Sequence, residues 1–305
     1  MNYLSKEFLV VRFPIYLPII YFLILNLFPS LEIYLLTFTL LFLAEPHFAA
    51  TWPIFFNKIN YPYIYHKKAQ LLYGTIFVLL FSIIGFFTFK NTFLLIFFAA
   101  NLFHVTRQSV GVLKLYYKSQ ALNQMINISY IFAITYFLIG LMRFYFPVIK
   151  NENLLATNLI ILSVICLSLI YFKIKEADNK DILTFFSGII IFYPICFVDK
   201  PIHAITMGVT MHYSQYLYFT YLIDKGRKLI FSKNLIFNYK FVLFILIYGI
   251  IMTMIVYLGK NESIFLKSLI IIPITGQMLH FYIDSFIWRF SEKHNREVTL
   301  KYIKI

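Results

Sequence analysis

Charged residues are scarce in this sequence. Only 13% of its 305 residues are Asp, Glu, Lys or Arg, whereas 61% are hydrophobic, and the mean hydropathy is +0.78. A soluble domain carries about 25% charged and about 45–50% apolar residues. No soluble core requires so little charge. The composition therefore excludes an ordinary soluble domain and predicts an integral membrane protein.

Cysteine is almost absent. The two cysteines, Cys166 and Cys196, each lie inside an apolar run. This excludes a disulfide framework and any zinc or iron–sulfur site built from cysteines. A small-residue cleavage site is also lacking after the first apolar run, which contains Pro14 and Pro18. We therefore expect a retained first helix rather than a signal peptide.

Acidic residues are few compared with basic ones. The chain has 13 Asp and Glu against 27 Lys and Arg, which gives a formal net charge of +14. In a soluble protein this excess would suggest nucleic acid as a partner. Here almost every Lys and Arg lies between apolar runs, so the excess indicates orientation in a lipid bilayer, and we expect no nucleic-acid partner.

The apolar runs are long enough to cross a membrane, because a spanning helix needs about 20 mostly apolar residues. We expect an all-α, polytopic bundle of about ten transmembrane helices, forming a single domain over residues 1–305. The expected spans are 8–28, 31–56, 69–89, 92–116, 124–149, 154–174, 181–198, 202–223, 240–259 and 264–289. Short polar or turn-prone breaks separate them.

Positive charge is distributed unequally between the two sets of loops that ten helices create. The loops on the side of the N-terminus carry twenty Lys and Arg residues. The opposite side carries five, namely Lys90, Lys150, Lys200, Lys260 and Lys267. Because positive charge prefers the cytoplasmic side of short loops, we expect both termini to be cytoplasmic in a multi-pass protein of the inner (cytoplasmic) membrane.

Polar and ionisable residues inside the apolar runs gather in four of the ten spans. Such groups cost several kcal/mol in a bilayer, roughly, unless they are paired or line a cavity. The four sets are Glu45, His47, Thr51 and Trp52; Asn101, His104, Arg107 and Gln108; His203, His212, Gln215 and Tyr216; and Gln277, His280, Asp284 and Arg289. All four spans are even-numbered, so they cross the membrane in the same direction.

Four histidines, one from each of these spans, are predicted at similar depths. His47, His104, His212 and His280 lie 16, 12, 10 and 16 residues past the starts of their spans. This spread of six residues corresponds to roughly 9 Å along a helix. If the four helices are neighbours, the four imidazoles can meet at one point.

The remaining histidines are expected outside this cluster. His203 precedes His212 by nine residues, about half a turn out of phase, and follows Asp199, Lys200 and Pro201 at the mouth of its span. We expect His66 and His294 to be solvated.

Four imidazoles without a usable cysteine would form an all-nitrogen metal site. Neutral imidazole binds iron, copper and zinc well. Iron, as Fe(II), can keep open positions for dioxygen and substrate in such a site. Asp284, Tyr216, Arg107 and Gln108 are the candidate catalytic residues, and Asp284, Gln108 and Tyr216 are of the kind that orients ligating imidazoles.

Two structural interpretations stand beside the metal site. Membrane histidines often form hydrogen bonds between helices without binding any ion. Glu45, Arg107 and Asp284 would alternatively form an ion-pair network or a proton relay.

The pattern of histidines resembles that of the Brp/Blh family of membrane β-carotene dioxygenases. The resemblance covers roughly residues 31–220 and comprises the pair Pro46-His47, then His104, then His212 with polar residues three and four positions on. The family pattern begins Pro-His-Gly, whereas Phe48 follows His47, and Tyr216 stands where the family has a further histidine. The resemblance implies a non-haem iron centre that cleaves a carotenoid with dioxygen, and His280 would replace the missing ligand.

Three functions from different classes follow from these residues. The leading hypothesis is a membrane-embedded, iron-dependent oxygenase that acts on a hydrophobic small molecule such as a carotenoid or another lipid. A haem protein with axial imidazoles is the second. A proton-coupled transporter that uses the buried His, Asp, Glu and Arg residues is the third, although we find no inverted repeat. The motifs of a histidine-box desaturase are absent from the sequence.

Overall fold

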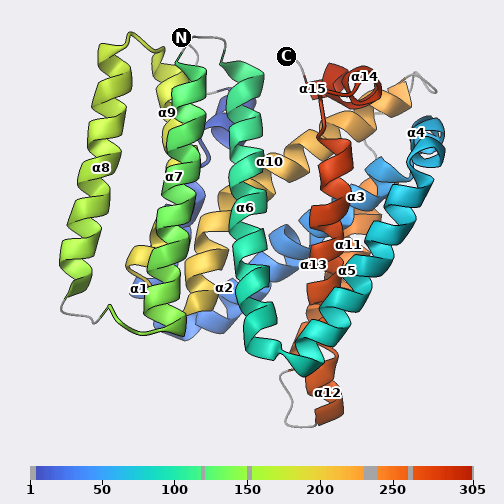
Figure 1. Ribbon diagram of the computed structural model, residues 1–305, viewed down its shortest axis with the longest axis horizontal. Helices are drawn as coiled ribbons and strands as arrows, with labels where there is room; N and C mark the ends of the chain where they lie inside the picture. The colour runs from blue at the N-terminus through green and yellow to red at the C-terminus, as the bar shows by residue number, and fades with distance from the viewer. Residues whose placement is uncertain (1–4, 118–120, 150–152, 230–238, 260–263, 304–305) are drawn as a thin grey trace. The chain divides into compact units, whose positions relative to one another are not determined.

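The computed structural model describes residues 5–117, 121–149, 153–229, 239–259 and 264–303. Within these ranges every secondary-structure element is a helix, which confirms the all-α prediction (Figure 1). Five lysines that enter the charge count, Lys118, Lys150, Lys233, Lys260 and Lys304, lie outside the described residues.

The helices follow the expected spans closely. The α-helices are α1 (Tyr16–Leu27), α2 (Glu32–Thr39), α3 (Glu45–Phe55), α4 (Tyr61–His66), α5 (Lys68–Thr88), α6 (Lys90–Tyr116), α7 (Leu122–Gly140), α8 (Leu154–Ile174), α9 (Asn179–Ile190), α10 (Pro201–Leu229), α11 (Tyr239–Leu258), α12 (Ile264–Ser268), α13 (Ile271–Ile287), α14 (Lys293–Asn295) and α15 (Lys301–Ile303). Segments of π-helix are η1 (Phe8–Arg12), η3 (Leu40–Ala44), η5 (Leu141–Tyr145) and η8 (Arg296–Leu300), and segments of 3₁₀-helix are η2 (Pro29–Leu31), η4 (Lys58–Asn60) and η7 (Tyr193–Cys196).

Seven helical stretches among the described residues are long and apolar enough to cross a membrane. They are Pro29–Phe55, Lys68–Thr88, Lys90–Tyr116, Leu122–Tyr145, Leu154–Ile174, Tyr239–Leu258 and Leu266–Ile287. Each coincides with one of the ten expected spans. Several apolar helices of this kind indicate a membrane protein.

The other three expected spans differ from a long apolar helix for separate reasons. The span 8–28 is broken at Pro14, so that η1 ends at Arg12 and α1 begins at Tyr16. The span 181–198 ends as α9 at Ile190, and Pro194 lies in the first turn of the following η7. The span 202–223 lies within the 29-residue α10, which is long enough but is rich in polar residues.

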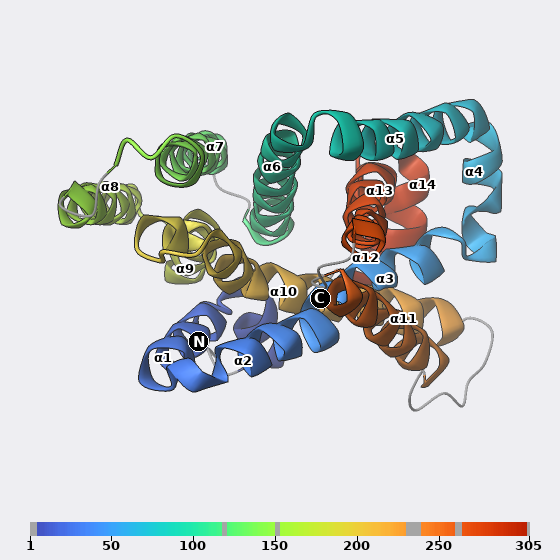
Figure 2. The same ribbon diagram turned by 90° about the horizontal axis from the view of Figure 1, so that it is seen from below.

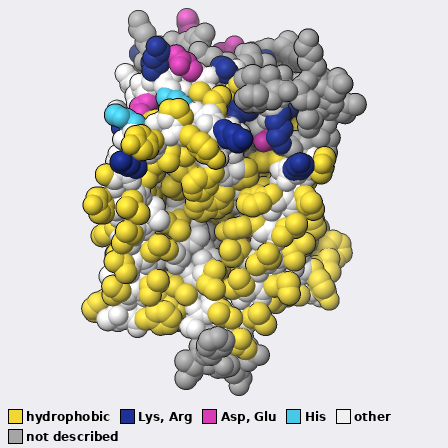
Figure 3. Space-filling view, turned by 90° about the vertical axis from the view of Figure 1, so that its right-hand side faces the viewer, with side chains coloured by type: hydrophobic (Ala, Val, Ile, Leu, Met, Phe, Trp, Pro, Cys, Tyr) yellow, Lys and Arg dark blue, Asp and Glu magenta, His cyan; other side chains and the backbone are white. Residues whose placement is uncertain are grey.

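The exposed surface of the apolar helices is hydrophobic. Exposed side chains include Phe77 and Leu80 on α5, and Leu243, Ile247 and Ile251 on α11. Figure 3 shows hydrophobic side chains over most of the face that it presents, with Lys and Arg confined to its upper part. A soluble monomer rarely exposes an apolar area larger than a few hundred Å², so this surface suits contact with lipid.

The chain divides into two compact units. The first consists of Met1–Leu36 and Asn101–Gln215, and the second of Thr37–Ala100 and Tyr216–Ile305. The helices α2, α6 and α10 each contribute residues to both units. The expectation of a single domain over the whole chain stays a prediction.

In the first unit, α9 packs against α7, α8 and η1 (Figure 2). Arg12, at the end of η1, donates hydrogen bonds to Asp181 Oδ1 at 2.6 Å and to Thr184 Oγ1 at 3.1 Å, both on α9. The side chain of Gln215 on α10 donates to the carbonyl of Val11 at 2.7 Å. The amide of Gln215 therefore fixes the N-terminal segment on α10.

In the second unit, α11 packs against α3, and α13 packs against both α5 and α3 (Figure 2). The buried guanidinium of Arg227 on α10 forms hydrogen bonds to two other segments of this unit. It donates to the carbonyl of Ile54 at 2.7 Å, to the carbonyl of Val298 at 2.9 Å and to Thr299 Oγ1 at 3.1 Å. Arg227 thus fastens η8 to the end of α3, the helix that carries His47 and Thr51.

Candidate metal centre

The four predicted metal ligands form two pairs, one in each unit. His104 of α6 and His212 of α10 belong to the first unit, whereas His47 of α3 and His280 of α13 belong to the second. All four are buried, with at most 8% of their surface exposed. Together with Asp284, they are among the residues whose ligand atoms can hold a metal ion.

The pair in the first unit is close enough for both rings to share an ion. The ring centroids of His104 and His212 are 5.7 Å apart and the ring planes are nearly perpendicular, at 87°. One nitrogen of each ring lies within 4.8 Å of the other. Ligands of one ion are separated by about 3–3.5 Å, so a modest adjustment of either rotamer brings both nitrogens to an ion.

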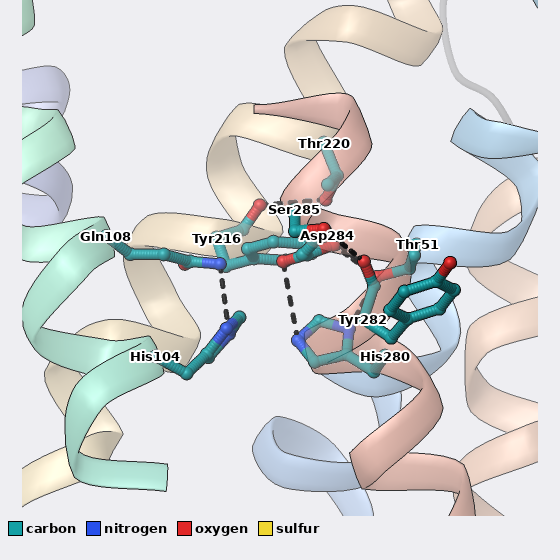
Figure 4. Close-up of polar contacts among 9 residues, drawn as sticks. All are labelled: Thr51, His104, Gln108, Tyr216, Thr220, His280, Tyr282, Asp284 and Ser285. Atoms are coloured by element: carbon teal, nitrogen blue, oxygen red, sulfur yellow. Dashed lines mark hydrogen bonds and ion pairs between the residues drawn. The ribbon is translucent and has the colours of Figure 1, made fainter. Parts of the chain in front are cut away.

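Gln108 holds the ring of His104. The two residues lie four positions apart on α6, and Gln108 Nε2 is 3.1 Å from His104 Nε2 (Figure 4). An amide nitrogen donates, so His104 Nε2 accepts and Nδ1 carries the proton. With the amide turned so that its oxygen accepts from Nε2–H, the lone pair of His104 would lie on Nδ1. The orientation of the Gln108 amide therefore determines which nitrogen of His104 carries the proton, and the role of Gln108 in orienting a ligand stays a prediction.

A close approach between helices positions His212. Gly208 lies one turn before His212 on α10, and a Cβ atom at Gly208 would lie 1.8 Å from the carbonyl oxygen of Ile191. Only glycine permits α10 to pack this closely against the chain that follows α9.

A widened turn positions His47. Pro46 has no N–H to donate to the preceding turn, and the π-helical turn η3 lies directly before it. Gly249 on α11 packs against this turn, because a Cβ atom there would lie 2.8 Å from the carbonyl oxygen of Leu41 and 3.2 Å from Pro46. Turns of π-helix are frequent at functional sites, and here one precedes a predicted ligand.

The pair in the second unit is closely packed. The ring centroids of His47 and His280 are 4.5 Å apart, and those of His47 and Tyr216 are also 4.5 Å apart. The ring centroids of Phe48 and His280 are 5.1 Å apart. The position at which the Brp/Blh pattern has glycine is therefore occupied by an aromatic side chain that contacts a predicted ligand.

Thr51 is the centre of a buried hydrogen-bond network in the second unit (Figure 4). Its Oγ1 lies 2.6 Å from the hydroxyl of Tyr216, 2.6 Å from His280 Nδ1 and 3.1 Å from Asp284 Oδ1. Tyr216 also donates to Asp284 Oδ1 at 2.7 Å, and Asp284 Oδ2 lies 3.5 Å from His280 Nε2. Three predicted residues therefore meet at one threonine.

Sequence reasoning grouped Thr51 with the polar residues of its span but did not assign it to the site. The signal was present, because Thr51 lies four residues after His47 and therefore on the same helical face. A threonine in a membrane helix usually bonds to the carbonyl four residues earlier, as Thr135 does. Thr51 instead contacts side chains of α10 and α13, which the sequence alone does not reveal.

Three other residues that the sequence singled out have the following surroundings. Arg107 is exposed, and its predicted catalytic role stays a prediction. His203 is buried between the hydroxyl of Tyr21 and Glu32 Oε1, each at 3.0 Å, which agrees with its expected place outside the cluster. His294 was expected to be solvated, but it stacks on Tyr63 with ring centroids 4.9 Å apart and contacts Asn60 Oδ1 at 2.9 Å.

Neither a family model, nor a curated protein, nor a solved structure matches this chain. The resemblance to the Brp/Blh family therefore stays a prediction that depends on Pro46, His47, His104 and His212. The donor atoms fit iron in their chemistry, because imidazole nitrogen and carboxylate oxygen are both ligands of non-haem iron in proteins.

Proposed function

We propose that this chain is a membrane-embedded oxygenase whose four histidines hold one non-haem iron ion and whose substrate is a hydrophobic small molecule. The observation that carries the proposal is the pairing of the predicted ligands. In each unit two buried histidines from distant parts of the sequence lie ring against ring, with centroids 5.7 Å apart in one unit and 4.5 Å apart in the other.

The sequence supports the sharing of one ion by the two pairs. The four histidines lie 10 to 16 residues past the starts of expected spans that cross the membrane in the same direction, so all four are expected at similar depth.

The chain's own residues would perform four tasks. His47, His104, His212 and His280 would hold iron, which when bound supplies the capacity to activate dioxygen. Gln108 and Thr51 orient His104 and His280 by hydrogen bonds to their second ring nitrogens. The aromatic side chains around the second pair, among them Phe48 and Trp288, exclude water. Such a site would receive its substrate from the bilayer, and the resemblance favours a carotenoid.

The membrane topology that we propose has ten spans and cytoplasmic termini. It is supported by the seven apolar helices and by the twenty-to-five division of Lys and Arg between the two sets of loops. The three weaker spans contain α1, α9 and α10. The exposed side chains of α1, such as Ile19 and Leu23, are apolar and suit lipid, whereas α9 and α10 would cross the bilayer with many of their side chains buried against neighbouring helices.

One observation favours a second function, proton-coupled transport. Glu45 on α3 is only 1% exposed, and its Oε2 has no hydrogen-bond partner among the described residues. A buried carboxyl group of this kind is typical of proton pathways in membranes. A transporter requires no bound metal, so metal analysis separates the two proposals.

The test is the metal content of purified protein. We expect wild-type protein in detergent to retain about one iron per chain, and His104→Ala or His47→Ala to lose it, because either change removes a bond to the ion. The matched control is His203→Gln, which alters a buried histidine outside the pairs and should leave the iron content unchanged. An absorption spectrum without a Soret band would distinguish non-haem iron from haem.

Two results would contradict the proposal. Wild-type protein that never carries metal would favour the transporter. If His104→Ala and His47→Ala each retained half of the wild-type metal content, the two histidine pairs would be independent sites and would not share one ion.

A further inference from the structure

Two side-chain atoms on α13 that can each bind a metal ion lie close together in the second unit. His280 and Asp284 are one helical turn apart, and His280 Nε2 is 3.5 Å from Asp284 Oδ2. Both side chains are buried, with exposures of 0% and 3%. Ligand atoms that bind one ion at about 2.0–2.2 Å are separated by about 3.0–3.5 Å, so this spacing suits two neighbouring positions on one ion.

The other polar atoms of these two side chains are held by hydroxyl groups. Asp284 Oδ1 accepts from Tyr216 at 2.7 Å and from Thr51 at 3.1 Å. Tyr216 donates its own proton to Asp284, so the single proton of Thr51 points toward the oxygen of Tyr216 and Asp284 Oδ1. Thr51 Oγ1 therefore accepts the Nδ1–H of His280 at 2.6 Å. In this arrangement the lone pair of His280 resides on Nε2, the nitrogen that faces Asp284.

A cation that lies between His280 Nε2 and Asp284 Oδ2 would be attracted by both atoms. We propose that His280 Nε2 and Asp284 Oδ2 are adjacent ligands of the metal ion, and that Thr51 is the positioning residue that presents both atoms. This inference rests on the proposed function and changes its donor set from four nitrogens to histidine nitrogens with one carboxylate oxygen. Asp284 then contributes a negative charge beside a buried divalent cation, which neutral imidazoles cannot do.

The alternative is that a proton, and not a metal ion, lies between His280 Nε2 and Asp284 Oδ2. If His280 carries a proton on each ring nitrogen, it forms a buried ion pair with Asp284 and binds no metal. The two arrangements differ in what happens when the carboxylate becomes an amide of the same shape. An amide removes a ligand in the first case, whereas in the second the metal affinity of the protein does not depend on residue 284.

The experiment loads the metal-free full-length protein in detergent with CoCl₂ and records occupancy and the visible absorption of bound Co(II). We expect Asp284→Asn to lower the Co(II) affinity by more than the about 10–100-fold that the loss of an orienting partner costs, and to change the absorption spectrum, because a ligand is lost. Thr51→Val, which keeps the shape but removes the hydroxyl, should lower the affinity by about 10–100-fold, and Thr51→Ser should restore it. His203→Gln should behave as wild type.

The possible outcomes separately test the carboxylate ligand, the metal centre as a whole and the role of Thr51. Wild-type affinity and spectrum in Asp284→Asn would overturn the carboxylate ligand while leaving the histidine centre intact. Wild-type protein that binds neither Co(II) nor iron would overturn the proposed function and this inference with it. If Asp284→Asn fails to fold, judged by its elution and its helical circular dichroism, the two Thr51 variants decide, and equal affinities for Val and Ser would overturn the inference.

Discussion

Replacing Gly208 with alanine should separate the two histidines of the first unit. The added Cβ atom would lie 1.8 Å from the carbonyl oxygen of Ile191 and 3.0 Å from its carbonyl carbon. Both are backbone atoms and cannot rotate away. To reach an ordinary contact, α10 and the chain after α9 must move apart by more than about 1 Å, which exceeds the tolerance of about 0.5 Å for a metal-binding geometry.

The cost of this change should lie at the upper end of the range for overpacking. Extra methyl groups in a packed interior cost about 1–3 kcal/mol, and more where the backbone must shift. We therefore expect Gly208→Ala to destabilise the protein by about 3 kcal/mol. Because His212 follows one turn later on α10, we also expect the metal affinity to fall by at least about 10-fold.

The matched control is Gly111→Ala. Gly111 lies within α6, and a Cβ atom there would meet nothing within 4 Å. Alanine in a helix interior is more favourable than glycine by about 0.5–1 kcal/mol, so this variant should be as stable as wild type or more so. Thermal unfolding in detergent and iron content per folded chain measure the two effects. Equal melting temperatures and equal iron contents for the two variants would refute the steric reasoning.

Two further predictions concern the ends of the chain. A reporter fused after Ile305 should be active only in its cytoplasmic form, and activity of a periplasmic reporter there would overturn the proposed topology. Burial, together with the nearby charge of Arg227, lowers the pKa of His294 in the folded protein. Because the unfolded chain then binds this proton more readily, stability should be complete above about pH 6.5 and should decrease as the pH falls below that value. His294→Gln should reduce this loss of stability, as measured by thermal unfolding between pH 7.5 and pH 5, and an unchanged pH dependence would show that His294 does not contribute.

The sequence by itself determined the helical class and the position of most helices. In lipid the backbone of a long apolar run would have no hydrogen-bond partner except itself, so each run such as Lys68–Thr88 was predicted to be helical, and the structure confirms the helices. Local chemistry also determined several boundaries. Proline at position 14 separates η1 from α1, and Asp178 accepts a hydrogen bond from the backbone N–H of Lys180 at the start of α9.

Helical periodicity also determined which polar residues share a face. His104 and Gln108, and likewise His280 and Asp284, are four residues apart, and both pairs are in contact in the structure. The out-of-phase position of His203 correctly placed it away from the predicted ligands.

Only the tertiary structure decided which helices meet and which atoms face each other. Pairing His104 with His212, or His47 with His280, depends on contacts between helices that are far apart in the sequence, which periodicity within one helix cannot specify. The close approach at Gly208 likewise depends on a carbonyl of a different segment. Thr51 shows the same limit, because its place on the face of His47 was readable from the sequence, whereas its contacts with Tyr216, His280 and Asp284 exist only once α3, α10 and α13 are packed together.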